Sequence, residues 1–267
     1  MMKLLTLNTH SYMETDFEVK LYQLVKMLVQ TRPDIISLQE VNQTLTAATL
    51  TPDDFYQPIT NEPPLIKSDN FAYRLTSELR SQGLAYYWTY ATSHIGYDRF
   101  DEGVAILSRV PFDSVKSVLV SENDRYVDYH RRQILQAEIS GVQVYAVHYS
   151  WWQEGFASEW QRTLENFDQK KTQFLLGDFN NDAAVRNEGY ELVRTATLQD
   201  AFLEAQIEIG EFTVKKAIDG WGKDSSNKRI DYIFISQGTV NRYEVVFDGD
   251  NYPIVSDHFG VLVEVSI

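Results

Sequence analysis

The sequence contains no cysteine, which excludes a disulfide framework and any thiolate metal site. No apolar run approaches the roughly 20 residues that a membrane-spanning helix needs. The segment from Met1 to Leu7 holds one lysine and a short apolar core interrupted by a threonine, which is too short and too polar for a signal peptide. These absences favour a soluble protein, and we expect it in the cytoplasm with no membrane partner.

The chain also lacks any basic run. Its 267 residues include 24 Lys and Arg against 38 Asp and Glu, for a formal net charge of −14, and the basic clusters are pairs such as Arg131–Arg132. A protein that grips a nucleic-acid backbone normally presents a basic stripe that displaces counterions. The charge therefore disfavours a nuclease. A bound metal ion could supply positive charge locally, so a nuclease stays open as an alternative.

Apolar spacing predicts alternating strands and helices. The helical period covers residues 17–31 and 70–83, and helices are also expected at 156–167 and 183–194. Short apolar runs predict strands at 3–7, 35–38, 86–90, 104–107, 114–120, 133–139, 142–148, 174–176, 229–235, 243–247 and 261–265. No linker, repeat or biased segment interrupts the chain. We expect one domain over residues 1–267, built from two packed sheets flanked by helices.

Polar side chains recur where the expected strands end. They are Asn8, His10, Glu40, His148, Asp178, Asn180, Asp231 and Ser256–Asp257–His258. Side chains at strand ends that face one edge of a sandwich converge there, which is where ligand-binding groups gather.

Each of these signals also has an ordinary structural interpretation. Glu40, after a buried strand, is more often a solvated end or a helix cap than a metal ligand. An Asx turn explains Asp178 or Asn180 and explains both less easily. Asp257–His258 has the residues of a metal ligand beside a general base, and equally those of a hydrogen-bonded pair that closes a sheet. Their combination is more specific than any single member.

The ligand chemistry of the set is that of hard cations. Carboxylate and amide oxygens suit Mg²⁺ or Mn²⁺ rather than Zn²⁺, and no histidines have the spacing of a zinc site. The sequence has no Walker phosphate loop, no Gly-x-Ser-x-Gly elbow, no His-Glu-x-x-His motif and no dinucleotide fingerprint. His94 and His130 lack a comparable context, so we expect them to be structural or on the surface.

Six motifs in this order resemble the series of the endonuclease/exonuclease/phosphatase superfamily, and together they span nearly the whole chain. They are Leu7-Asn8, Leu38-Gln39-Glu40, Val147-His148-Tyr149, Gly177-Asp178-Phe179-Asn180, Arg229-Ile230-Asp231-Tyr232 and Ser256-Asp257-His258. The resemblance implies an α/β fold in which two mixed β-sheets pack face to face with helices on their outer faces. It also implies a metal-dependent phosphoric ester hydrolase, with Mg²⁺ or Mn²⁺ as cofactor.

The same resemblance implies metal and acid–base roles. Asn8, Glu40 and Asp257 would hold or flank the metal. His258 would be the general base, oriented and kept basic by Asp231. The implied reaction is in-line attack of water on phosphorus, with the metal neutralising charge on the phosphate oxygens.

The remaining positions of the series would contact the phosphate. Asp178 and Asn180 would position the attacking water and the phosphate, and His148 would donate to a phosphate oxygen. Whether His258 or Asp178 activates the water stays open. In abasic-site endonucleases the position of His10 is typically Asp and that of His148 is Tyr, so the resemblance favours the phosphatase and phosphodiesterase branches over DNA repair.

Aromatic residues near these motifs bear on the substrate. Trp151 and Trp152 follow the His148 strand, and Trp221 precedes the Asp231 strand. Core packing accounts for part of this set, but two adjacent residues on a regular element cannot both face one core, so at least one should line the mouth of the site. There it could stack on a sugar ring or a base. These three tryptophans and His10 are therefore the candidate substrate-binding residues.

Two further stretches, residues 94–108 and 185–190, resemble a bacterial subgroup that includes maltose 6′-phosphate phosphatase. We therefore expect a small phosphorylated substrate such as a sugar phosphate. A nuclease acting on DNA or RNA is the alternative, and a sphingomyelinase-like phosphodiesterase ranks behind it. No obligate protein partner is evident.

Overall fold

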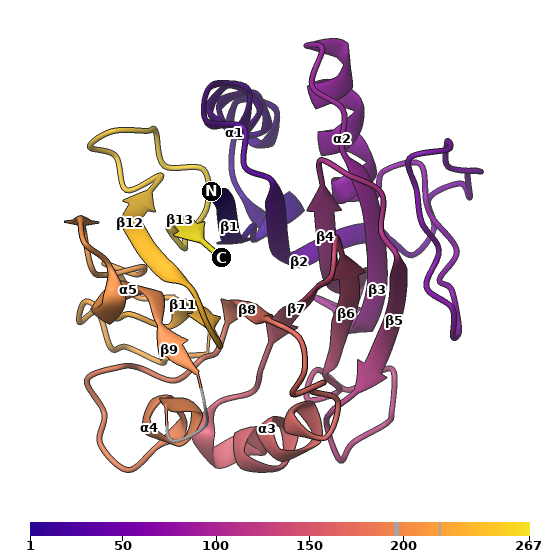
Figure 1. Cartoon of the computed structure of the whole chain (residues 1–267). Coiled ribbons are helices and arrows are strands. Elements are labelled where there is room, and N and C mark those ends of the chain that lie inside the picture. The colour runs from indigo at the N-terminus through magenta and orange to yellow at the C-terminus, as the bar shows by residue number, and fades with distance from the viewer. Residues whose placement is uncertain (195–197, 219) are drawn as a thin grey trace.

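The structure, a computed structural model, describes residues 1–194, 198–218 and 220–267. Two mixed β-sheets pack face to face (Figure 1). The seven-stranded sheet has the order β10 (Glu208–Ile209), β12 (Thr239–Val246), β13 (Gly260–Ser266), β1 (Met2–Asn8), β2 (Ile35–Thr44), β4 (Phe100–Ser108), β3 (Tyr87–Gly96). The six-stranded sheet has the order β5 (Ser114–Leu119), β6 (Gln133–Ile139), β7 (Val142–His148), β8 (Gln173–Asp178), β11 (Asp231–Ile235), β9 (Gln199–Asp200).

Helices cover the outer faces of both sheets (Figure 1). On the seven-stranded sheet these are α1 (Phe17–Thr31) and α2 (Phe71–Ser81), and on the six-stranded sheet α3 (Phe156–Leu164) and α4 (Gly189–Arg194). The short α5 (Ala201–Glu204) lies against β11 and β12, and 3₁₀ turns occur at η1 (Ser11–Met13) and η2 (Trp152–Glu154). The expected layered α/β sandwich is thus confirmed. Among the described residues, no helix combines the length and apolarity needed to cross a bilayer.

Apolar burial explains the layers. The inner faces of the two sheets share one core, which includes Ile106, Val144 and Ile233. In α1, Leu21, Leu24 and Leu28 recur at helical spacing and pack onto the outer face of the seven-stranded sheet. Burying each such side chain contributes about 1.5–3 kcal/mol, so the helices are held mainly by this stripe.

Strand β2 differs from the sequence prediction. We expected it to end at Gln39–Glu40, but it continues to Thr44, with a register shift between Leu38 and Val41 in its pairing with β4. Glu40 lies in this bulge with a φ of +50°. A bulge re-aims a side chain without ending the strand, and a positive φ at a non-glycine residue is held only when its surroundings enforce it.

The helix predicted at 183–194 is wrong over its first half, because only Gly189–Arg194 is helical. Asp182 accepts a hydrogen bond from the backbone of Ala184, and Asn187 has a φ of +60°. Such local turns compete with helix formation. Strands β3 and β4 are longer than their apolar cores of 86–90 and 104–107 indicated.

Candidate active site

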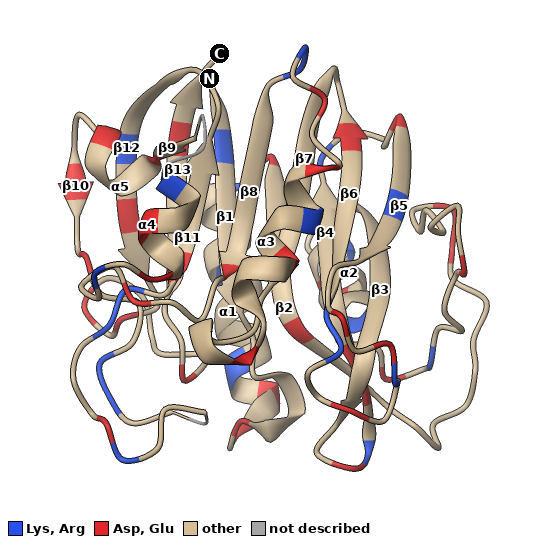
Figure 2. Ribbon diagram, turned by 90° about the horizontal axis from the view of Figure 1, so that it is seen from below, with Lys and Arg blue, Asp and Glu red and all other residues tan. Residues whose placement is uncertain are grey.

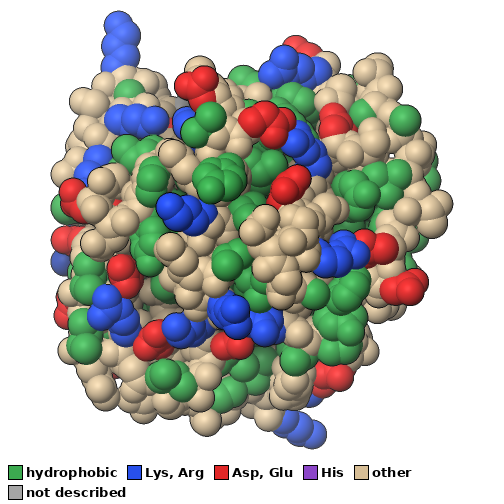
Figure 3. Space-filling view, turned by 90° about the horizontal axis from the view of Figure 1, so that it is seen from above, with side chains coloured by type: hydrophobic (Ala, Val, Ile, Leu, Met, Phe, Trp, Pro, Cys, Tyr) green, Lys and Arg blue, Asp and Glu red, His purple; other side chains and the backbone are tan. Residues whose placement is uncertain are grey.

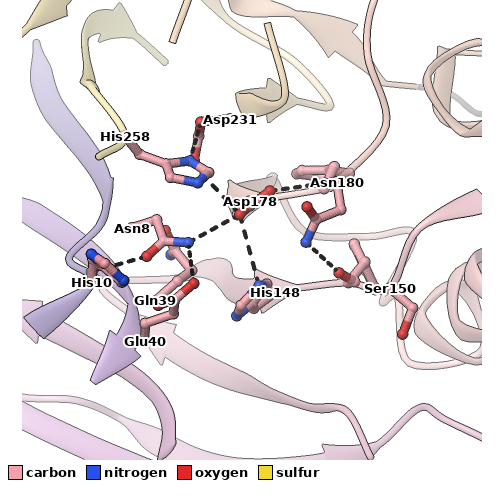
Figure 4. Close-up of polar contacts among 12 residues, drawn as sticks. Asn8, His10, Gln39, Glu40, His148, Ser150, Asp178, Asn180, Asp231 and His258 are labelled. Atoms are coloured by element: carbon pink, nitrogen blue, oxygen red, sulfur yellow. Dashed lines mark hydrogen bonds and ion pairs between the residues drawn. The ribbon is translucent and has the colours of Figure 1, made fainter. Parts of the chain in front are cut away.

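Four of the predicted residues meet at one edge of the sandwich, opposite the two chain termini (Figure 2). Asn8 ends β1, His148 ends β7 and Asp178 ends β8, while Glu40 lies in the bulge of β2. The Asn8 Nδ2 amide donates to Asp178 Oδ2 at 3.0 Å and to Glu40 Oε1 at 2.9 Å. Because β1 and β8 belong to different sheets, Asn8 joins the two sheets at the site (Figure 4).

Glu40 presents a carboxylate oxygen without a partner. Its Oε2 is buried and makes no hydrogen bond to any described residue. Burial, followed by the charges of Glu102 and Asp257, raises the pKa of Glu40 to about 8. A buried oxygen without a donor, among acidic groups that repel each other, fits the oxygen-ligand site of a divalent cation. Asn8 and Asp257 are its neighbours in that site.

Asp178 lies at the centre of the cluster (Figure 4) and is 1% exposed. Its Oδ1 accepts the backbone N–H of Asn180 at 2.8 Å, and the amide of Asn180 donates to the Tyr149 carbonyl at 3.0 Å. The Asx turn weighed in the sequence is therefore present, and Asp178 Oδ2, which accepts from Asn8, faces the site. Burial, then the charge of Asp231, raises the pKa of Asp178 to about 7 against the opposing effect of His258.

His258 and Asp231 form a buried pair. The His258 Nδ1 lies 3.0 Å from Asp231 Oδ2 and 3.8 Å from Asp178 Oδ2. Burial opposes the imidazolium of His258, but Asp231 and Asp178 outweigh it and hold its pKa well above the ordinary value. The backbone N–H of Asp231 donates to Thr213 Oγ1 at 3.2 Å, and Ser256 Oγ donates to the Asn8 carbonyl at 2.7 Å. These bonds fix the loops that carry the pair.

His148 is a neutral imidazole beside Asp178. Its Nε2 lies 3.7 Å from Asp178 Oδ2. Burial, with the positive charges of Arg132 and His94, lowers the pKa of His148 well below its ordinary value. A neutral imidazole can donate one hydrogen bond to an anionic ligand without adding charge.

His10 lies beside Asp257, one of the predicted metal residues, and outside the cavity lining. Its Nδ1 is 2.7 Å from Glu14 Oε1 and 3.7 Å from Asp257 Oδ1, and its backbone N–H donates to Asn8 Oδ1 at 3.2 Å. Burial lowers the pKa of His10, but these carboxylates outweigh it and raise it to about 9. His10 thus contacts Glu14 and two of the predicted metal residues, Asn8 and Asp257.

The three predicted tryptophans separate. Trp151 lines the cavity, where Gly220 lies so close that a Cβ there would come within 1.9 Å of the indole Cζ2. Trp152 instead packs near Phe156, with ring centroids 6.3 Å apart. Trp221 packs against a small apolar cluster formed by Val214, Ile218 and Ile230. The structure therefore places one of the three in the wall of the site.

A cavity of about 420 Å³ opens over the cluster. The predicted residues in its lining are Glu40, His148, Trp151, Asp178, Asn180 and His258. Asn8 and Asp231 hold lining residues from behind, whereas Asp257 lies beside His10, outside the lining. The site thus has its catalytic candidates at one end and an aromatic wall beside them.

Several lining residues were missed in the sequence: His94, Tyr97, Glu102, Tyr129, Arg132 and Glu154. His94 is buried, with Nε2 3.2 Å from Glu102 Oε1 and Nδ1 3.2 Å from the Arg131 carbonyl oxygen. His130, in contrast, is partly exposed and pairs with Asp128 at 2.7 Å. Arg132 directly precedes β6, whose start lies beside the end of β7 because the two strands are antiparallel. That adjacency was the available signal.

Comparisons with known proteins agree with the family resemblance of the sequence motifs. The chain matches the profile of the Endonuclease/Exonuclease/phosphatase family over residues 5–258. A search of curated proteins returns no match. Among solved structures, an endonuclease/exonuclease/phosphatase family protein from Leptotrichia buccalis is 28% identical, with a TM-score of 0.87 and 100% of both chains covered.

Two solved structures with lower identity share the fold, each with 100% of both chains covered. A mannosyl-6-phosphatase from Bacteroides thetaiotaomicron is 17% identical, with a TM-score of 0.63. A 3′ phosphatase from Neisseria, bound to a product DNA hairpin, is 20% identical, with a TM-score of 0.65. These two resemblances support the architecture alone.

Proposed function

The chain belongs to the endonuclease/exonuclease/phosphatase family of metal-dependent phosphoester hydrolases, and within it we propose a Mg²⁺-dependent phosphatase that acts on a small phosphorylated molecule such as a sugar phosphate. The observation that carries this proposal is the cavity of about 420 Å³, which has the catalytic candidates and Trp151 in its walls. Pockets of this size hold small molecules. The flat indole face offers a stacking surface to a sugar ring.

Charge supports a small substrate over a polynucleotide. The cavity lining contains one Arg and no Lys in the described part of the chain, together with four acidic residues, Glu40, Glu102, Glu154 and Asp178. Loops at the edge of the site carry acidic and basic residues side by side (Figure 2), and the face over α1 and α2 intersperses basic side chains with acidic and apolar ones (Figure 3). A duplex tracked along its phosphates needs a more continuous positive surface.

The residues present fit a divalent cation. Glu40 supplies an unpartnered carboxylate oxygen, and Asn8 and Asp257 lie beside it. Hard oxygen ligands of this kind suit Mg²⁺ or Mn²⁺. When bound, such an ion neutralises charge on the phosphate and leaving-group oxygens.

The chain's own groups would position water and phosphate. Asp231 holds the His258 ring through Nδ1 at 3.0 Å, which leaves Nε2 as the nitrogen available to the ligand. Asp178 Oδ2 lies 3.8 Å from His258 Nδ1, so its carboxylate stands beside the imidazole that would activate the water. Asn180 and the neutral His148 contribute hydrogen bonds to the remaining phosphate oxygens.

A substrate screen tests the proposal. Hexose phosphates, nucleotides, a choline phosphodiester, 3′-phosphorylated DNA and abasic DNA are each incubated with Mg²⁺, with Mn²⁺ and with EDTA, and released phosphate or cleavage is measured. We expect metal-dependent phosphate release from sugar phosphates and little action on DNA. Efficient cleavage of DNA with sugar phosphates untouched would refute the phosphatase and support the nuclease.

A further inference from the structure

Arg132 is a buried cation that no carboxylate of the described residues contacts directly; the charge of Glu159 reaches it only through Ser150. Arg132 is 3% exposed and lines the cavity. The other two deeply buried Lys and Arg side chains among the described residues are paired, Arg229 with Asp200 at 2.7 Å and Lys228 with Asp224 at 3.0 Å. No carboxylate of the described residues lies within 4.0 Å of the Arg132 guanidinium.

A buried guanidinium that no carboxylate contacts is unfavourable in the protein without a ligand. An ionised group removed from water is costly unless a counter-charge and hydrogen bonds replace the lost hydration. Arginine cannot escape the cost by losing its proton, because its pKa is too high. We therefore expect a bound anionic ligand to provide the counter-charge of the guanidinium.

The protein holds the side chain from behind. Its Nε donates to Ser150 Oγ at 3.3 Å, and Ser150 in turn donates from Oγ to Glu159 Oε1 at 2.7 Å and from its backbone N–H to Glu159 Oε2 at 2.8 Å. The indole of Trp151 lies 5.9 Å from the guanidinium carbon. Neither terminal nitrogen of Arg132 bonds to a described residue, so this pair of nitrogens, the guanidinium fork, can bind a ligand in the cavity.

Strand pairing places this fork near the phosphate end of the site. Leu135 of β6 is opposite Ala146 of β7, which puts the start of β6 beside the end of β7 at His148. His148 is in turn opposite Asp178 on β8. Arg132, His148 and Asp178 therefore follow one another along three neighbouring strands at the same edge.

We propose that Arg132 binds two non-bridging oxygens of a phosphate monoester dianion and thereby selects monoesters over diesters. This inference rests on the proposed phosphatase function. A monoester carries about −1.5 to −2 at pH 7 and has three terminal oxygens, whereas a diester carries one charge and has two. The acidic lining repels the additional charge, and the planar fork of an arginine is suited to offset it through paired hydrogen bonds.

The test compares Arg132→Met and Arg132→Lys with Arg125→Met, which removes an equal charge from an exposed position in the same loop. The substrates are p-nitrophenyl phosphate and bis(p-nitrophenyl) phosphate, which share a leaving group, assayed with Mg²⁺. We expect Arg132→Met to lower kcat/KM for the monoester by about 10- to 100-fold and to affect the diester much less. Inhibition by inorganic phosphate should weaken in parallel, the lysine variant should retain part of the preference, and Arg125→Met should match the wild type.

Thermal unfolding separates binding from a structural role. Because no carboxylate contacts the Arg132 guanidinium directly, Arg132→Met should change Tm little. A lowered Tm of Arg132→Met, with equal losses of activity on both substrates, would show a structural role for Arg132 and overturn the inference. The proposed phosphatase function would still hold in that case if the wild type prefers the monoester. A wild type that hydrolyses the diester faster than the monoester would instead overturn the proposed function, and monoester selection with it.

Discussion

Replacing Glu40 by glutamine should abolish activity and change how the stability of the metal-free protein depends on pH. The carboxylate accepts from Asn8 through Oε1 at 2.9 Å, and its Oε2 has no partner in the described structure. Burial, then Glu102 and Asp257, raises the pKa of Glu40 from 4.5 to about 8. Glutamine keeps the shape and the acceptor for Asn8 but carries no charge.

The sign and size follow from linkage between protonation and folding. A carboxyl whose pKa is higher in the folded state costs no stability below its unfolded pKa, and the cost grows as pH rises toward the folded value. For this shift the cost rises by roughly 2.5 kcal/mol between pH 5 and pH 7. Glu40 is partly accessible to solvent, so screening reduces this to about 1–2 kcal/mol. Effects of the substitution that do not depend on pH cancel in the comparison.

Urea unfolding in EDTA at several pH values measures this difference. The free energy of unfolding of Glu40→Gln, relative to wild type, should increase by about 1–2 kcal/mol from pH 5 to pH 7. Excess Mg²⁺ should then stabilise the wild type by mass action and the variant much less. Glu122→Gln, at an exposed position, is the matched control and should show neither effect. A pH-independent difference, or full turnover by Glu40→Gln, would refute the reasoning.

The remaining predictions concern the acid–base pair, the aromatic wall and salt. His258→Ala and Asp231→Asn should each lower kcat by about 10²–10⁴-fold. The double variant should lose little more, because the two residues act as a unit. A loss in the double variant equal to the product of the two single losses would show that they act separately. Trp151→Ala should raise KM for a sugar phosphate more than for methyl phosphate, which has no ring to stack. Trp152→Ala, which loses packing on Phe156, should instead cost about 1–3 kcal/mol of stability in urea unfolding. Between low and physiological salt, kcat/KM for the sugar phosphate should change only several-fold, since a partly buried phosphate contact is weakly screened; a steep logarithmic slope would indicate polynucleotide binding.

The parts of the fold that local physics determines could be predicted. The helix at 17–31 agrees with α1 at both ends, because its apolar stripe is regular and Arg32, with a φ of +50°, ends it before Pro33. The strands at 133–139 and 142–148 also agree with β6 and β7. The signal for α1 is a helical period that matches one buried face, and for β6 and β7 it is a short run of residues that are buried on both faces.

The features that depend on distant pairing could not be predicted. Gln39 and Glu40 are polar residues after an apolar run, which locally looks like a strand end. Only the pairing of β2 with β4 shows that the strand continues through a bulge to Thr44. The same holds for the bond from Asn8 to Asp178 across the two sheets, since nothing in either local segment specifies the other.

Two of the residues missed in the cavity, Glu102 and Arg132, have a common origin. Polar residues at strand ends mark only the groups on strands that run toward the site. Strands β4 and β6 run away from it, so Glu102 near the start of β4 and Arg132 just before β6 reach the same edge from the opposite direction. An antiparallel partner brings its start to the edge where its neighbour ends. The strand-end residues are mainly carboxylates, amides and imidazoles, so that pattern also leaves out the one arginine in the described lining, for which we propose phosphate binding.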